Sequence, residues 1–237
     1  MKSRPFKETT RLIAVSDNIQ PMNFELAVID LDNTLYSADC GVFARMDRRM
    51  TAFVARELGI DLQEADLLRV KYWRQYGTTL RGMMLHHGME AETFLHDVHD
   101  IDAHEILHRD EALDHALGRL PGRKVIHTNG IREHAERILS TLGIGHHFEA
   151  IYDIRFHDYI PKPCQQTLAS LIDAEHCTPE RTLVVDDMAN NLRAAKALGC
   201  KTAWISHQVK GAAEGTWNYH IPTFHHLPEA LAGRIQE

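Results

Sequence analysis

The sequence has few of the features that mark secreted, membrane-spanning or nucleic-acid-binding proteins. It contains 4 cysteines and no C-x-x-C pair, so neither a zinc knuckle nor a redox dithiol is predicted. No apolar run approaches the roughly 20 residues of a membrane span, and residues 1–22 lack the apolar centre of a signal peptide. Lys and Arg number 26 against 33 Asp and Glu, a net charge of -7 that argues against a binder of nucleic-acid polymers. We therefore expect a cytoplasmic protein with reduced cysteines and no membrane segment.

What the sequence does contain is enough apolar material for a hydrophobic core. Its 237 residues are 44% hydrophobic and 25% charged, which suits one large domain or a core with a modest insertion. Residues 1–23 are polar and aperiodic, so we expect a loosely ordered extension there. Composition leaves the oligomeric state open.

Short apolar runs, each too brief for a helix and rich in β-branched residues, recur along the chain. Such runs are typical of strands buried on both faces of a parallel sheet. They are Leu26–Ile29, Lys124–Ile126, Ala150–Tyr152, Thr182–Val185 and Thr202–Ile205. Helical patterns accompany the later runs, at Ile131–Leu142, Gln165–Ala174 and Asn190–Leu198. The alternation predicts an α/β fold with a doubly wound, mostly parallel, Rossmann-like sheet.

One long interval breaks this alternation. It contains only helix-like segments, at Val42–Leu58, Gln63–Tyr76, Thr78–His87 and Glu90–His99. We predict that residues 41–118 form a helical cap inserted into an α/β core made of residues 24–40 and 119–237. The insertion leaves the core after the carboxyl end of the first strand, where ligands bind in open α/β sheets. The cap is therefore predicted to cover the active site.

Two of the predicted strands deliver paired acids. Asp30 and Asp32 follow the first strand, and Asp186 and Asp187 follow the fourth. One such pair can simply cap a turn, but the repetition favours a site, because the carboxyl ends of parallel strands share one edge of the sheet. Two unit charges 4 Å apart repel by about 4 kcal/mol at a surface-like dielectric, so the converging carboxylates need a cation. Oxygen ligands beside a phosphate predict Mg²⁺.

Two further segments supply groups suited to a phosphate. Thr128, Asn129 and Gly130 follow the second strand, and the glycine is expected to free backbone N–H groups for an anion. Lys162 stands between two prolines that stiffen its backbone. We expect Thr128 and the nearby amides to bind the phosphoryl oxygens and Lys162 to neutralise them.

These motifs, in this order, resemble the haloacid dehalogenase (HAD) superfamily over roughly residues 25–206. The resemblance implies a phosphatase, because the dehalogenases match only the first aspartate. It implies that Asp30 is the nucleophile that forms an aspartyl-phosphate and that Asp32 is the general acid and base. It also implies that Mg²⁺ is held by Asp30, the backbone carbonyl of Asp32 and the Asp186/Asp187 pair, with the direct ligand of that pair left open.

A finer resemblance concerns the substrate. The segments Asp32–Tyr36 and Tyr76–Gly82, with His86 and His87, are similar to the pyrimidine 5′-nucleotidase subgroup. This resemblance implies hydrolysis of UMP- or CMP-type monophosphates, and Arg81 is the predicted substrate contact from the cap. The alternatives are a sugar-phosphate or phosphoglycolate phosphatase or a phosphomutase on the same core, and more remotely a zinc-dependent or non-catalytic interaction protein.

Several histidines and one tryptophan need separate interpretation. His104 and His108 fit the zinc-protease pattern H-E-x-x-H, but with 17 histidines in the chain we interpret the match as accidental. Among the histidines, only His127 lies at a strand end near Asp30, and we expect its side chain to point to the opposite face of the sheet. Trp73 could stack on a base, and we favour packing within the cap instead.

Overall fold

The computed structural model describes residues 24–206 and 217–233. The extension predicted at residues 1–23 lies outside the described residues. Among the helices that are described, none combines the length and the apolar character needed to cross a bilayer.

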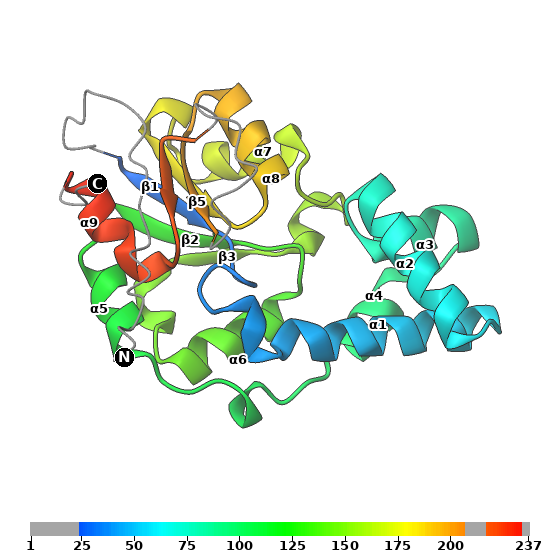
Figure 1. Cartoon of the computed structure of the whole chain (residues 1–237). Coiled ribbons are helices and arrows are strands. Elements are labelled where there is room, and N and C mark those ends of the chain that lie inside the picture. Colours follow the sequence, from blue (N-terminus) through cyan, green and yellow to red (C-terminus); the bar gives the residue numbers. More distant parts are fainter. Residues whose placement is uncertain (1–23, 207–216, 234–237) are drawn as a thin grey trace, which may run out of the picture.

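The centre of the molecule is a parallel sheet of six strands in the order β3-β2-β1-β4-β5-β6 (Figure 1). Neighbouring strands in this sheet all pair in parallel, so the predicted α/β, Rossmann-like fold is confirmed. The strands are β1 Leu26–Ile29, β2 Arg123–His127, β3 Ala150–Tyr152, β4 Thr182–Asp186, β5 Lys201–Ile205 and β6 Tyr219–Ile221.

The register of the central strands decides where their polar ends meet. Ile29 of β1 lies opposite Ile126 of β2 and Val185 of β4, so the three strands finish at the same level. All four residues of β1 and all five of β4 are buried, as expected for strands covered on both faces. The residues that follow these strands are therefore brought to one edge.

The sequence analysis located five of the strands and missed β6. This strand has only three residues, two of which are partly exposed, so it lacks the apolar run that marked the others. It pairs with β5 at the end of the sheet, and Ile221 alone is buried.

Helices cover both faces of the sheet (Figure 1). On one face Leu26 and Val28 pack with α7 and α8, and on the other face Ala27 and Ile29 pack with α5, α6 and α9. The alternation of neighbouring β1 residues between two apolar clusters is what a doubly wound sheet requires. The bounds are α5 Glu111–Gly118, α6 Arg132–Leu142, α7 Gln165–Ala174, α8 Ala189–Leu198 and α9 Leu227–Leu231.

The first four α-helices after β1 project from one side of the sheet (Figure 1). Local signals define their ends, since Asp61 and Thr78 cap the amino ends of two of them and Gly59, Gly77 and Gly88 close three carboxyl ends with positive φ. The bounds are α1 Val42–Leu58, α2 Leu62–Tyr76, α3 Thr79–His87 and α4 Ala91–His99. We call α1–α4 the helical insertion.

The segment that follows α4 packs against the sheet. Ile101, Leu113 and Leu117 are buried in the apolar cluster that also contains Ile29 of the sheet. We propose from this packing that the cap ends near residue 100, so that α5 is counted with the α/β core rather than within a cap of residues 41–118.

The contact between α2 and α3 gives a test of this packing. A Cβ atom on Gly82 would lie 2.2 Å from Cγ and 2.5 Å from Cβ of Tyr72, atoms too near the α2 backbone to swing aside. Gly82→Ala should therefore lower the free energy of unfolding by about 1–3 kcal/mol, although alanine is the better helix former. Thermal and urea denaturation measure the change.

The matched control is Gly118→Ala in α5, where the nearest atom to the new Cβ is Cε1 of His147 at 3.6 Å. This variant should be neutral, or more stable by up to about 1 kcal/mol. Equal effects of the two substitutions would contradict the close approach of α2 and α3.

Candidate active site

Lys162 lies between two aspartates, Asp30 and Asp186, which stand at the carboxyl ends of β1 and β4. Lys162 Nζ donates hydrogen bonds to Asp30 Oδ1 at 2.6 Å, to Asp186 Oδ2 at 3.0 Å and to the carbonyl oxygen of His127 at 2.8 Å. Thr34 Oγ1 donates to the other oxygen of Asp30 at 2.8 Å. All three partners of this ion-pair bridge are buried, so its charges face a medium that screens them weakly.

Three carboxylates gather beside this bridge. Oxygens of Asp30, Asp186 and Asp187 lie within 4.8 Å of one another. Burial, which Lys162 only partly offsets, raises the pKa of Asp30 to about 7, and burial with the charges of Asp30 and Asp186 raises the pKa of Asp187 to about 8. Burial and the mutual repulsion of the carboxylates are the physical causes, and a hard divalent cation with oxygen ligands would relieve the repulsion.

The two adjacent acids after β4 have different surroundings. Asp186 Oδ1 accepts hydrogen bonds from the backbone N–H of Met188 at 2.8 Å and from Asn191 Nδ2 at 2.9 Å, and its Oδ2 accepts from Asn191 and Lys162. No other described residue donates to the carboxylate of Asp187. Asn191, on the first turn of α8, was missed by the sequence analysis, because only the folded turn brings it back to Asp186.

Asp32 lies beside Asp30 and has partners that the sequence analysis did not find. Its Oδ1 accepts hydrogen bonds from the Tyr36 hydroxyl and from His134 Nε2, the latter at 2.9 Å. Burial opposes ionisation, but the charge and hydrogen bond of His134, with that of Tyr36, lower the pKa of Asp32 to about 2. His127, by contrast, is held against His157 with ring centroids 6.0 Å apart, and burial lowers its pKa well below the usual value.

The loop after β2 is ordered by its own hydrogen bonds. The N–H of Gly130 donates to Thr128 Oγ1 at 2.9 Å, so this amide is already used rather than presented to an anion as we expected. An accepting hydroxyl keeps its own proton for a further acceptor, and this remains the predicted role of Thr128. Asn129 Oδ1 accepts from the backbone N–H of Lys162 at 2.8 Å, which fixes the loop that carries the lysine.

A cavity of about 370 Å³ connects these groups with the helical insertion. Ligand sites commonly occupy about 300–1,000 Å³. Apolar side chains line much of it, and the polar groups of Asp30, Asp32, Asn129, Gly130, Lys162 and Asp187 lie at its core end. Asn33 Oδ1, also on its wall, is buried and has no hydrogen-bond partner among the described residues.

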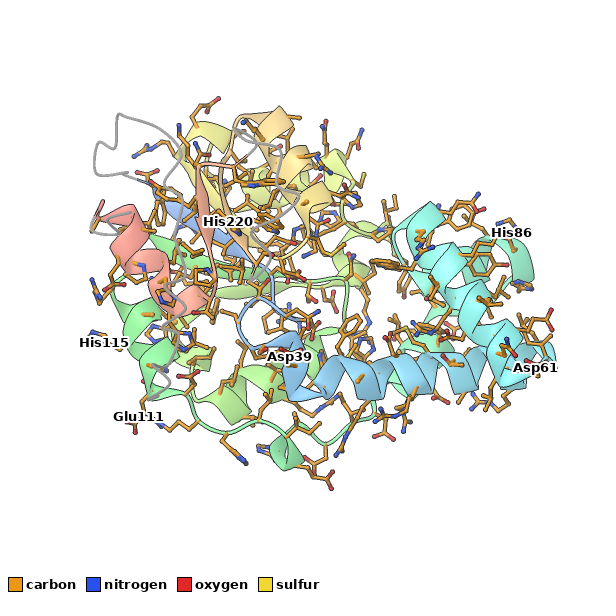
Figure 2. All side chains as sticks on the ribbon, viewed as in Figure 1. Asp39, Asp61, His86, Glu111, His115 and His220 are labelled. Atoms are coloured by element: carbon orange, nitrogen blue, oxygen red, sulfur yellow. The ribbon has the colours of Figure 1, made fainter. Side chains whose placement is uncertain are left out.

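The insertion does not contribute the residue that we predicted. Arg81 is not among the residues that line the cavity, whereas Arg69 is, and Arg69 is paired with Asp47 at 2.8 Å and Asp66 at 2.9 Å. Trp73 also lines the cavity and is 45% exposed, so packing within the cap does not account for it. His86 projects from the part of the insertion far from the sheet (Figure 2).

The H-E-x-x-H match does not form a metal site. His104 and Glu105 lie in a three-residue 3₁₀ turn that ends before His108, so the two histidines do not share a helix face. His104 Nδ1 instead meets the hydroxyl of Thr141 at 3.2 Å. Neither histidine belongs to a group of potential metal ligands found in the described part of the chain.

A family model described as haloacid dehalogenase-like hydrolase matches residues 24–199. The chain is similar to the Saccharomyces cerevisiae protein named phosphate metabolism protein 8, with 28% identity over 195 residues. That match covers 72% of this chain but only 58% of the yeast protein.

Solved structures show the same fold at low sequence identity. A HAD phosphatase from Thermococcus onnurineus superposes with a TM-score of 0.60 at 19% identity, covering 89% of this chain and 100% of that one. The HAD-hydrolase YfnB from Bacillus subtilis, described as bound to magnesium, gives 0.60 at 15% identity, covering 89% and 99%. An L-2-haloacid dehalogenase from Xanthobacter autotrophicus gives 0.57 at 15% identity, covering 90% and 100%.

The ion-pair bridge predicts how stability depends on pH. Lys162→Met should lower the free energy of unfolding by about 3–5 kcal/mol at pH 8 in EDTA, because Asp30 and Asp186 lose their buried cation. The raised pKa of Asp30 rises further without the lysine, so at pH 5 the group is protonated and the loss should be smaller. Urea denaturation at both pH values measures the difference.

Lys124→Met is the matched control, since Lys124 in β2 is also a buried lysine but, among the described residues, donates a hydrogen bond only to the carbonyl oxygen of Gly122, at 3.1 Å. The loss of stability caused by Lys124→Met should not grow between pH 5 and pH 8 as the loss caused by Lys162→Met does. A loss for Lys162→Met that is equal at the two pH values would contradict the bridge.

Proposed function

The chain belongs to the haloacid dehalogenase-like hydrolases, and from its site we propose that it is a magnesium-dependent phosphomonoesterase that works through Asp30. The observation that carries the proposal is the pairing of Asp30 with a second carboxylate, Asp32, on the wall of one cavity. A dehalogenase needs the first aspartate for its covalent intermediate, but a phosphatase also needs a group that protonates an alcohol. The name of the yeast relative, which refers to phosphate metabolism, supports the same choice.

The proposed reaction has two displacements at phosphorus. A carboxylate oxygen of Asp30 attacks the phosphorus, the bond to the leaving oxygen breaks, and Asp32 gives its proton to the departing alcohol. Asp32 then removes a proton from a water molecule, whose oxygen attacks the phosphorus of the aspartyl-phosphate and releases inorganic phosphate and the Asp30 carboxylate. Asp32 is ionised in the free site, so it must gain its proton when the phosphate dianion binds.

The acidic cluster supports the proposed metal site. Asp30 and Asp187 have oxygens suited to a hard cation, and Asp32 would add its backbone carbonyl. Because both oxygens of Asp186 are already occupied by N–H donors, we assign Asp187 as the direct ligand and Asp186 as the partner of Lys162. Bound Mg²⁺ would offset the negative charge on the transferring phosphoryl group. The magnesium described for the similarly folded YfnB supports this assignment.

The cavity supports a neutral, flat leaving group, such as the nucleoside of UMP or CMP. Phosphoglycolate would bring a carboxylate that needs its own cation. Among the described residues that line the cavity, the two permanent cations are Arg69, which is paired with two aspartates, and Lys162, which is paired at the phosphate end. Trp73 offers an exposed aromatic face instead, and bases stack on such faces.

The metal assignment predicts a defined dependence on pH. EDTA should abolish phosphate release, and added Mg²⁺ should restore it. Metal binding requires ionised ligands, so the affinity for Mg²⁺ should rise between pH 6 and pH 8, where Asp30 and Asp187 lose their protons in the free site. Isothermal titration of Mg²⁺ at several pH values measures this dependence.

A pair of variants makes the test specific. Asp187→Asn should weaken Mg²⁺ binding by at least about tenfold, in the range typical of a lost ligand interaction. Asp173→Asn, in an exposed acid on α7, should leave Mg²⁺ binding unchanged. Full affinity in Asp187→Asn, or affinity that does not vary with pH, would refute the assigned site.

The substrate assignment rests on Trp73. Trp73→Ala should lower kcat/KM for UMP by about ten- to a hundredfold, since stacking of a base on an aromatic ring contributes about 1–3 kcal/mol. Glycerol phosphate, which has no ring, should be hydrolysed by the variant and the wild type at similar rates. Arg81→Ala is the control within the insertion and should change neither substrate. Equal losses on both substrates would place Trp73 in the structure of the insertion, and a wild-type preference for phosphoglycolate would remove the nucleotide assignment.

A further inference from the structure

The surroundings of Asp32 are asymmetric. Its two hydrogen-bond donors among the described residues, the Tyr36 hydroxyl and His134 Nε2, approach the same oxygen, Oδ1. Asp32 is on the cavity wall, with a side chain that is 14% exposed. Its Oδ2 receives no hydrogen bond from another described residue, so one carboxylate oxygen is held and the other is left for the cavity.

His134 itself is held from several sides. It lies in the first turn of α6 and is only 1% exposed. Its ring packs on that of His99 in the insertion, with centroids 5.1 Å apart. His99 Nδ1 is bonded to the carbonyl oxygen of Leu95 at 2.8 Å, and Arg137 of α6 donates to the carbonyl oxygen of His99 at 2.6 Å. The imidazole that reaches Asp32 therefore has a rigid support from both the core and the insertion.

We propose that His134 and Tyr36 are positioning residues that fix Asp32 through Oδ1, so that Oδ2 exchanges the proton with the leaving alcohol and with water. This inference rests on the proposed phosphomonoesterase function. An aspartate with both oxygens free can rotate about its side-chain bonds, and a misplacement of about 1 Å at a reacting group can cost a hundredfold in rate. Two donors on one oxygen remove that freedom.

The leaving group separates positioning from structure. His134→Ala should lower kcat for an alkyl phosphate such as glycerol phosphate by about ten- to a hundredfold with little change in KM, because the poor leaving group needs its proton. The first-turnover burst with 4-nitrophenyl phosphate should remain within a few-fold of wild type, since this leaving group departs without protonation. His134→Gln places an amide N–H near the position of Nε2 and should recover most of the activity.

A second set of variants removes the ambiguity of a folding defect. Tyr36→Phe deletes one donor with almost no change in volume and should show the same selectivity for the poor leaving group. In an Asp32→Asn background, His134→Ala should cause no further loss, because the group it positions is gone. His115→Gln is the control, since His115 projects outward from α5 (Figure 2).

The outcomes are distinct. Equal losses on both substrates, an additive loss in the Asp32→Asn background, or unchanged activity on glycerol phosphate would overturn the positioning role. If the wild-type protein released no phosphate from either substrate, the proposed function itself would fail, whatever the variants did.

A second candidate site rests on a different observation. Asp114 of α5 faces two consecutive histidines, His146 and His147, in the 3₁₀ turn that follows α6. Both imidazoles direct Nε2 to Asp114 Oδ1, at 3.2 Å and 2.6 Å, and their rings are tilted by 38° with centroids 4.0 Å apart. Consecutive side chains usually diverge, so this convergence on one oxygen is a property of the turn.

We infer that these three residues bind a zinc-type divalent ion. Two imidazoles and one carboxylate suit Zn²⁺, Co²⁺ or Ni²⁺ better than Mg²⁺. Ligand atoms around tetrahedral Zn²⁺ lie about 3.3 Å apart, given bonds of about 2.0–2.1 Å. The 3.2 Å separation fits this spacing, and the 2.6 Å separation would open slightly on binding. The ion would join α5 to the turn after α6, far from the Mg²⁺ cluster.

The test uses the metals alone. Titration with Co²⁺ at pH 7.5 should show one site per chain by its visible absorption, displaced by Zn²⁺ and not by Mg²⁺. His146→Ala and Asp114→Asn should each weaken this site by at least tenfold, whereas His115→Ala, one position from Asp114 on the same helix, should not. Loss of the site in the control, or its persistence in both ligand variants, would overturn the inference.

Discussion

The interaction on which the rest of the site depends is the ion-pair bridge of Lys162 between Asp30 and Asp186. It places one ammonium between two carboxylates that the register of β1 and β4 forces together. The bridge holds the proposed nucleophile in place. Both of the lysine's carboxylate partners are buried, so water does not solvate them freely. One lysine cannot neutralise Asp30, Asp186 and Asp187 at once, and the residual negative charge favours the binding of a cation at this edge of the sheet.

The remaining architecture follows from this constraint. The loop that carries Lys162 is fixed by Asn129, and Asp186 is held by Asn191 and the start of α8, so its two oxygens are used before any ligand arrives. Asp187 is then the acid of this pair whose carboxylate accepts no hydrogen bond from another residue in the described part of the chain. On the other side of Asp30, Asp32 is oriented by groups from β1's own loop and from α6. The helical insertion adds an apolar wall and Trp73, so the proposed phosphate chemistry and the proposed choice of substrate rest on different parts of the chain.

Much of this arrangement could be predicted because it is local in sequence. The buried strands appear as apolar runs, and the acids at their ends must share an edge once the sheet is parallel. His134 and Asn191 could not be found in this way, because each lies on a helix and reaches its aspartate only after the chain has folded back. Arg81 was chosen for its place after a flexible turn, but the helix it belongs to directs other residues to the cavity. The strand β6 is too short and too exposed to appear as an apolar run in the sequence.

The central claim is that Asp30 becomes phosphorylated during turnover. The most direct measurement is an acid quench within the first turnover of a ³²P-labelled monoester in the presence of Mg²⁺, followed by digestion and mapping of the labelled peptide. We expect acid-stable, hydroxylamine-labile label on the peptide that contains Asp30, and its disappearance as inorganic phosphate forms. Turnover with no covalent label, or label on a peptide that lacks Asp30, would contradict it.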